Sequence, residues 1–407
     1  MLYRKVPKNG DELSILGFGC MRLPVKEGQI DEPRAIRQIR SAIDRGVNYL
    51  DTAWPYHGGE SEPLVGRALK GGYRERVKLA TKLPSFLIKT RQDMDSYLNA
   101  QLKKLATGQI DYYLVHTLTG PVWDTLVQLG IHDFLDRAKA EGRIVNAGFS
   151  FHGLPEDFSR IVDDYPWDFC QIQYNFLDEE YQAGRAGLNY AAAKNLAVMV
   201  MEPLRGGNLG SPTQPPEVEK IWAEARTPRT PVGWALLWLW NHPEVTVVLS
   251  GMNEEAHIDE NIALANQAYP GILNDSETAL VSRVAKTYRK LMKVACTGCG
   301  YCMPCPANVA IPVCFEMYNK MHMFNEPDSA RFGYAIRMSG DLTGGVSGYA
   351  SQCVQCGQCV DKCPQQIPIP DVLTQVVADL EGEGLAERLA TARKIMLKEI
   401  HSLPASF

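Results

Sequence analysis

The sequence lacks the features that mark membrane, secreted and nucleic-acid-binding proteins. Its longest apolar stretch, residues 232–240, is too short to cross a bilayer. The N-terminal stretch MLYRKVPKNGDELS has no apolar segment typical of a signal peptide. There is no basic excess, because 42 Lys and Arg stand against 47 Asp and Glu for a net charge of −5. We therefore expect a cytoplasmic protein with neither a membrane nor a nucleic-acid partner.

Cysteine is scarce over most of the chain and abundant near its end. Of the 11 cysteines, only Cys20 and Cys170 precede residue 290, and the others lie between Cys296 and Cys363. A secreted protein held by disulfides would spread its cysteines more evenly. Clustered thiols in a cytoplasmic protein indicate metal binding instead.

Residues 33–265 alternate between amphipathic helical stretches and short apolar runs typical of strands. With one strand before the first helix, this predicts an α/β fold, a (β/α)₈ TIM barrel. An open doubly wound sheet is the alternative, but neither GxGxxG nor GxxxxGK[ST] occurs. The predicted strands are 15–20, 48–51, 77–81, 111–116, 145–150, 169–174, 198–201 and 245–249.

The predicted helices include 34–45, 91–105, 123–141 and 231–241. The Gly- and Pro-rich stretch 202–230 is a long loop at the predicted catalytic face, either functional or a tolerated insertion. After residue 270 the pattern changes, so we place a barrel domain at 1–290 and a smaller, mostly helical domain at 291–407.

Two cysteine runs in the second domain have iron–sulfur spacing. The later run, CVQCGQCVDKCP, is the C-x₂-C-x₂-C-x₃-C-P pattern of bacterial ferredoxins, and the earlier run, CTGCGYCMPCP, is one residue shorter in its last gap. Together they supply the thiolates for two [4Fe–4S] clusters: Cys296, Cys299, Cys302, Cys305, Cys353, Cys356, Cys359 and Cys363.

The fourth cysteine of each ferredoxin run ligates the other cluster in two-cluster ferredoxins. This predicts Cys363 on the cluster of Cys296, Cys299 and Cys302, and Cys305 on the cluster of Cys353, Cys356 and Cys359. Zinc is the alternative metal, although zinc sites more often use two separated cysteine pairs. Cys314 is left over and is expected to be a small buried hydrophobe.

Four polar residues stand at the predicted C-terminal ends of strands: Asp51, Tyr56, Lys82 and His116. Active sites of such barrels are built at that face. A lysine ammonium lowers the pKa of a nearby tyrosine, and an aspartate keeps the lysine charged. A histidine can polarise a substrate carbonyl while the tyrosine donates a proton to it.

These four residues, with the DTA-x₂-Y-x-G pattern and the LVH triplet, resemble the catalytic tetrad of aldo-keto reductases. The resemblance covers about residues 1–270. The cysteine-rich tail is similar to a bacterial subgroup of that family with a fused ferredoxin-type domain. The resemblance implies a nicotinamide cofactor, NADP or NAD, and a small carbonyl or alcohol substrate.

It also implies a set of cofactor-binding positions on the barrel loops. Two of them, Gly251 and His257, lack the lysine and arginine that many family members use for the 2′-phosphate of NADP, so NADH or a flavin is also compatible. Arg205 is a candidate substitute for that charge. The set is Gly19, Cys20, Met21, Ser150, Phe151, Gln171, Met201, Pro203, Leu204, Arg205, Gly206, Ser250, Gly251, His257 and Asn261, and Asn175 and Trp54 are candidates for the pocket wall.

The sequence leaves two classes of function open. One is an oxidoreductase that reduces a carbonyl or oxidises an alcohol at the tetrad, with electron relay through the clusters to a redox partner such as a ferredoxin or a flavoprotein. Two other roles for the clusters stay open, which are service of a bound flavin and a mainly structural role. The other is a redox-partner binding or electron-transfer subunit whose barrel binds nicotinamide or flavin without carbonyl turnover. The intact tetrad favours the first, because binding alone does not require all four residues.

Overall fold

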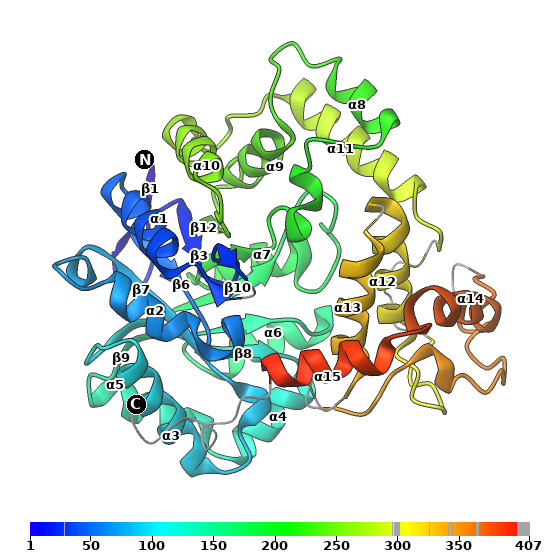
Figure 1. Ribbon diagram of the computed structural model, residues 1–407, viewed down its shortest axis with the longest axis horizontal. Coiled ribbons are helices and arrows are strands. Elements are labelled where there is room, and N and C mark those ends of the chain that lie inside the picture. Colours follow the sequence, from blue (N-terminus) through cyan, green and yellow to red (C-terminus); the bar gives the residue numbers. More distant parts are fainter. Residues whose placement is uncertain are drawn as a thin grey trace. The chain divides into compact units, whose positions relative to one another are not determined.

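Eight parallel strands form a closed barrel in the computed structural model (Figure 1). The structure describes residues 1–27, 29–294, 296, 302–324, 326–340, 342, 345–363 and 366–396. The strands follow one another around the barrel in chain order, and the last pairs with the first. The predicted (β/α)₈ fold is confirmed. The strands are Leu16–Gly19 (β3), Tyr49–Asp51 (β6), Lys78–Leu83 (β7), Ile110–Leu118 (β8), Ile144–Phe151 (β9), Phe169–Gln173 (β10), Ala197–Met201 (β11) and Val245–Ser250 (β12).

Helices cover the outside of the barrel strands (Figure 1). Their starts carry local signals, such as the Asp31 side chain that accepts a hydrogen bond from the Arg34 N–H at the start of α1. None of the helices in the described ranges has the length and apolar character that a membrane span requires. The helices are Glu32–Asp44 (α1), Ser61–Ala68 (α2), Arg91–Lys104 (α3), Gly120–Gln128 (α4), Ile131–Ala140 (α5), Pro155–Asp164 (α6), Gly184–Ala193 (α7), Pro231–Trp240 (α9) and Glu255–Gln267 (α10).

Aromatic side chains fill the barrel interior. Tyr112 packs edge-on against both Tyr49 and Phe169, with ring centroids 5.4 and 5.0 Å apart. The N-terminal hairpin of Tyr3–Lys5 (β1) and Glu12–Ser14 (β2) flanks Val6, which joins the same buried cluster. The predicted polar residues stand at the carboxyl ends of the strands.

One helix prediction is wrong. Residues 123–141 were expected to form a single helix, but the chain forms α4 and α5 with a break at Gly130. Gly130 adopts φ +81°, a left-handed conformation that glycine tolerates without a steric penalty. The apolar periodicity continues across the break, so it does not reveal the turn.

The described chain divides into two compact units. Of the described residues, 1–212 and 227–281 belong to the barrel unit, and 213–226 and those from 282 to 396 belong to the second. The stretch 202–230 is thus divided between them: Arg205–Gly210 (η4) lies in the barrel unit and Pro216–Trp222 (α8) in the second. The predicted domain boundary near residue 290 stays a prediction.

The second unit is mostly helical, as expected. Its helices are Ile311–Phe324 (α12), Pro327–Met338 (α13), Ile369–Val376 (α14) with the π-turn Val377–Glu381 (η6), and Leu385–Met396 (α15), while Asp275–Lys290 (α11) leads into the unit. A buried core gathers Phe315, Tyr334 and Leu373. Cys314 is fully buried in this core, which agrees with its predicted role as a small hydrophobe. Glu224 and Arg283 form an ion pair at 2.5 Å that ties the α8 segment to α11 within the unit.

Gly148 in β9 tests the close packing of the barrel. A Cβ at this position would lie 2.5 to 2.7 Å from the ring of Phe169, which has no room to move in the barrel core. We expect Gly148→Ala to lower the free energy of unfolding by about 1–3 kcal/mol in urea denaturation, because overpacking forces strain on the neighbours. Gly108→Ala is the matched control, since nothing lies within 4 Å of its Cβ position. An equal effect of the two substitutions would contradict this packing.

Candidate functional site

Three neighbouring strands and the turn after the first of them bring the four predicted polar residues together. Asp51 ends β6, Lys82 lies near the end of β7 and His116 lies in β8, and β7 pairs with both β6 and β8. Tyr56 begins the short helix Tyr56–Gly59 (η1) just after β6. Parallel strands place their carboxyl ends at one face, so residues far apart in the sequence meet there.

Lys82 is the centre of the group. Its Nζ donates to Asp51 Oδ1 at 2.6 Å and to the Thr52 carbonyl at 2.8 Å, and it lies 3.3 Å from the Tyr56 hydroxyl. The His116 ring lies edge-on to the Tyr56 ring with centroids 6.2 Å apart. The Lys82 side chain is fully buried and that of Asp51 is 4% exposed, so this is a desolvated ion pair. Separating a desolvated ion pair is costly, because each charge would be left buried without its partner. The pair therefore holds its geometry.

Burial and neighbouring charge act together on these groups. Burial acts to lower the pKa of Lys82, but the carboxylate of Asp51 raises it above its usual value, so the ammonium persists. Burial, followed by the positive charge of Lys82, holds the pKa of His116 well below its usual value, so the imidazole is neutral. His116 Nδ1 has no hydrogen-bond partner among the described residues.

The expected effect on the tyrosine is only half correct. Lys82 does act to lower the pKa of Tyr56, but burial acts more strongly and the pKa is raised overall. The phenol is therefore fully protonated at neutral pH, with Lys82 offsetting part of the cost of ionising it.

A second buried polar group stands behind Lys82, and the sequence analysis missed it. The Glu62 carboxylate accepts from Thr81 Oγ1 at 2.7 Å and from Gln101 Nε2 at 2.6 Å. The same Gln101 nitrogen also donates to the Lys82 carbonyl at 2.9 Å. Thus Glu62 in α2 and Gln101 in α3 fix the strand that carries Lys82. The signal available in the sequence was the charged Glu62 inside the segment that forms α2. The structure buries nearly every residue of that helix.

Trp54 is well packed, and its place in the pocket wall stays a prediction. It is 1% exposed, its ring lies edge-on to Tyr97 at 4.8 Å, and the Lys104 ammonium sits 3.5 Å from its ring centroid. His57, which the sequence analysis also missed, fixes the adjoining turn, because its Nε2 accepts from the Leu23 N–H at 3.0 Å.

Most of the predicted cofactor positions lie at the ends of the remaining barrel strands or just beyond them, while Gln171 lies within β10 and His257 and Asn261 lie within α10. Ser150 and Phe151 end β9, Met201 ends β11 and Ser250 ends β12, while Gly19, Cys20 and Met21 follow one another at the end of β3. Gln171 in β10 donates to Met201 Sδ at 3.5 Å, and its Oε1 is buried with no partner among the described residues. Asn261 in α10 donates to Ser250 Oγ at 2.9 Å.

The loop after β11 is anchored by charge. Arg205 Nε pairs with Asp178 Oδ2 at 3.1 Å, and both side chains are 10% exposed. Asn175 Nδ2 donates to the same carboxylate oxygen and to the Glu202 carbonyl. Arg205 is therefore engaged in holding its own loop. Pro203, Leu204 and Gly206 belong to the same loop, and Arg22 Nη1 donates to the Gly206 carbonyl at 2.6 Å.

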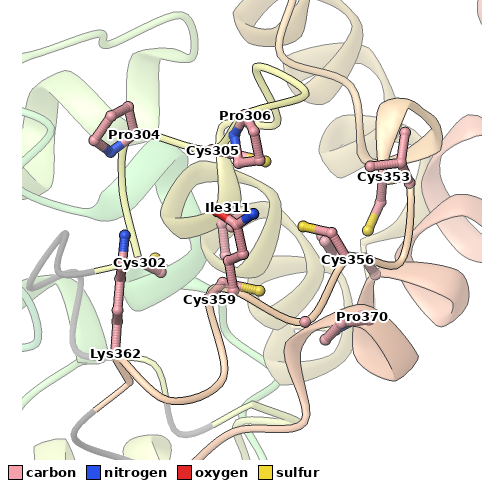
Figure 2. A pocket seen from close by; sticks show the side chains of 14 residues that line it. Cys302, Pro304, Cys305, Pro306, Ile311, Cys353, Cys356, Cys359, Lys362 and Pro370 are labelled. Carbon is pink, nitrogen blue, oxygen red and sulfur yellow. The ribbon is translucent and has the colours of Figure 1, made fainter.

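Cysteines of both runs line one pocket in the second unit (Figure 2). Cys305 comes from the first run, and Cys353, Cys356 and Cys359 come from the second; Cys302 also lines the pocket. Burial raises the pKa of Cys359, and the neighbouring Cys353, Cys305 and Cys356 thiols add to this. All described cysteines are free thiols.

The other predicted ligands are only partly described. Cys296 and Cys363 are half-buried and pack against the same core, and Cys299 lies outside the described residues. Within the described ranges, no three His, Cys, Asp or Glu side chains gather closely enough to hold a single metal ion.

Comparison with known proteins identifies both parts. A profile of the Aldo/keto reductase family matches residues 15–271, more than half of the chain. The chain belongs to the aldo/keto reductase family. A profile described as a 4Fe-4S dicluster domain matches residues 295–367. The protein is therefore an oxidoreductase of a nicotinamide-dependent family with an added iron–sulfur domain.

Individual relatives cover the barrel part. The NADH-specific methylglyoxal reductase of Escherichia coli (strain K12) is 25% identical over 70% of this chain and 100% of its own. Aldo-keto reductase YhdN of Bacillus subtilis (strain 168) is 36% identical over 51% of this chain and 64% of its own. The solved holo structure of aldo-keto reductase AKR11C1 from Bacillus halodurans matches with a TM-score of 0.60 and 25% identity, over 70% of this chain and 96% of its own.

The ion pair of Lys82 with Asp51 can be tested by a double-mutant cycle. We expect Asp51→Asn to destabilise the protein by about 3–5 kcal/mol, because it leaves the buried Lys82 ammonium without its counter-charge. The double variant Asp51→Asn with Lys82→Met should recover part of that loss in urea denaturation followed by circular dichroism.

The exposed pair of Arg160 with Asp124 supplies the control, since both side chains are about half exposed. Asp124→Asn should change the free energy of unfolding by less than about 1 kcal/mol. Strictly additive losses for Asp51 and Lys82 would contradict a coupled buried pair.

Proposed function

We propose that the protein is an NADH-dependent reductase of small carbonyl compounds, with two [4Fe–4S] clusters in its second unit as a one-electron relay. The observation that carries the proposal is the buried contact of Lys82 Nζ with both Asp51 and the Tyr56 hydroxyl, beside a neutral His116. In the reverse direction the same site oxidises an alcohol.

Each of the four residues has one task in this reaction. The His116 ring donates a hydrogen bond to the carbonyl oxygen and polarises it. As the hydride reaches the carbonyl carbon, the Tyr56 hydroxyl gives its proton to that oxygen and an alcohol forms. Lys82 stabilises the developing phenolate, and Asp51 keeps Lys82 charged.

The residues present fit a bound nicotinamide. The buried Gln171 Oε1 lacks a partner among the described residues and can accept from a carboxamide, and Ser150 at the end of β9 lies beside β10. A reduced nicotinamide held by these residues would supply the hydride. Asn261 and Ser250 are already joined by a hydrogen bond where the resemblance puts the adenosine end.

The charges around that adenosine end support NADH over NADPH. Arg205 pairs with Asp178, and Arg34 pairs with Glu254 at 2.6 Å and with Glu255. Glu254 immediately precedes α10 and Glu255 begins it, on the approach to His257, so added phosphate charge would meet carboxylates there. The E. coli relative described as NADH-specific is consistent with this preference.

The cysteine pocket supports cluster binding in which the fourth cysteine of each run ligates the cluster of the other run. Cys305 stands with Cys353, Cys356 and Cys359 around one pocket, as the crossed pattern of two-cluster ferredoxins requires (Figure 2). Cys302, which that pattern assigns to the other cluster, lines the same pocket. Four thiolates on short loops are the donor set of an iron–sulfur cubane. A cluster carries single electrons and a nicotinamide carries a hydride, so the relay calls for a two-electron intermediary such as a flavin, held here or by a redox partner.

Removing the Tyr56 hydroxyl tests the reaction. Tyr56→Phe keeps the ring against His116 but removes the proton donor, so we expect kcat to fall at least about a hundredfold. NADH oxidation with methylglyoxal as the probe measures it, and the visible spectrum of the iron–sulfur centres should not change. Tyr165→Phe is a control on the barrel exterior, where the hydroxyl donates to Asp136. Unchanged turnover in Tyr56→Phe would refute the assignment.

A charge change at position 257 tests the cofactor preference. The wild-type protein should bind NADH more tightly than NADPH in fluorescence titrations. His257→Arg adds a guanidinium at an exposed position, and we expect it to tighten NADPH binding about fivefold to tenfold while leaving NADH nearly unchanged. His257→Gln is the uncharged control. Tighter binding of NADPH than of NADH by the wild type would overturn the preference.

A further inference from the structure

A buried tyrosine and a buried glutamate brace the turn that leads into the second cysteine run. Tyr334 in α13 is fully buried and Glu381 at the end of η6 is 6% exposed. The Tyr334 hydroxyl donates to Glu381 Oε1 at 2.5 Å. A carboxyl group at this depth is costly unless it is hydrogen-bonded, so its partners define its purpose.

Both residues also bind backbone N–H groups of Ala350–Gln352 (η5). The Tyr334 hydroxyl accepts from the Ala350 N–H at 2.8 Å, and Glu381 Oε1 accepts from the Ser351 N–H at 3.0 Å. These are the first N–H groups of a helical turn, which have no partner inside the turn. The pair therefore caps η5 from the side.

The capped turn in turn holds the first cysteine of the run. The Cys353 N–H donates to the Ala350 carbonyl at 3.0 Å. The Ala350 N–H, which binds the Tyr334 hydroxyl, belongs to the preceding peptide unit. Tyr334 therefore fixes the peptide next to the one that positions Cys353. Glu381 is itself held, because Arg388 donates to the carbonyls of Leu380 and Glu381. The chain of contacts runs from α15 through Glu381 and Tyr334 to Cys353.

We propose that Tyr334 and Glu381 are positioning residues for the cluster bound by Cys353, setting how firmly its loop closes and thereby how far water reaches it. The proposal rests on the proposed cluster ligation. Ala350 and Ser351 precede the second cysteine run and not the first. The hydrogen bonds of Tyr334 and Glu381 therefore act on the segment that leads into Cys353. The effect should therefore fall on one cluster and spare the other.

Anaerobic redox titration followed by electron paramagnetic resonance tests the brace. Tyr334→Phe and Glu381→Leu each remove buried hydrogen bonds and loosen the turn, so water gains access to one cluster. Water stabilises the more highly charged reduced cluster, so the reduction potential of that cluster should become less negative. Its bleaching by an iron chelator should become about tenfold faster, because the loop opens more often.

Glu381→Gln is the conservative variant, because its amide oxygen can still accept from Tyr334 and from the Ser351 N–H. It should retain a near wild-type potential and bleaching rate, which a purely electrostatic role of the carboxylate would not allow. Tyr318→Phe is the matched control on α12, because its hydroxyl bonds to the side chains of Gln375, at 3.3 Å, and Asp379 rather than to η5. It should change neither cluster.

The outcomes separate this proposal from the one on which it rests. A wild-type protein without labile sulfide would overturn the cluster assignment itself. Two normal clusters with unchanged potentials and bleaching rates in Tyr334→Phe and Glu381→Leu would overturn only the brace. Equal shifts of both clusters in these variants, or a shifted potential in Glu381→Gln as large as in Glu381→Leu, would also overturn it.

Discussion

The buried contact of Lys82 with Asp51 is the constraint on which the barrel site depends. An ammonium without a counter-charge could not persist at this depth, so Asp51 must stand at the end of the neighbouring strand. The closed barrel supplies that position, because β6, β7 and β8 are successive and parallel. Burial keeps Tyr56 protonated and His116 neutral, while the Lys82 charge places a cation beside the Tyr56 oxygen and adds to the lowering of the His116 pKa. The hydrogen bonds of Glu62 with Thr81 and of Gln101 with the Lys82 carbonyl hold the end of β7 in place.

The second unit has to position cysteine side chains, and it too uses buried polar groups to do so. Its cysteines must be free and must converge from two segments far apart in the sequence, and Cys305 does join the later run around one pocket. Buried polar groups again fix the backbone beside the reactive side chains, here Tyr334 and Glu381. The stretch after β11 begins with residues near the barrel site and continues into α8 of the second unit. In the proposed function, hydride chemistry and one-electron chemistry are combined in one chain with separate ligand sets.

Much of this could be predicted from the sequence because its signals are local and periodic. Apolar runs bounded by turns predict all eight barrel strands, and the spacing of the cysteines predicts their chemistry. The break at Gly130 was missed because the apolar pattern runs through it. The direction of the Tyr56 pKa was misjudged because sequence reveals a neighbouring charge but not the depth of burial.

Side-chain networks were the least predictable part. Glu62, Gln101, Tyr334 and Glu381 matter through partners 16 to 47 residues away, and no short motif encodes such pairings. Arg205 shows the same limit, since its availability for a phosphate depends on Asp178, which only the fold brings to it.

Transfer of deuterium from labelled NADH is the most direct measurement of the central claim. The protein is incubated anaerobically with NADH deuterated at one face of C4 and with methylglyoxal, and the product alcohol is analysed by mass spectrometry. A hydride site at the barrel predicts that one of the two C4 faces delivers its deuterium to the former carbonyl carbon, without exchange with water. Product that carries no deuterium from either face, or no product although NADH is oxidised, would contradict the account.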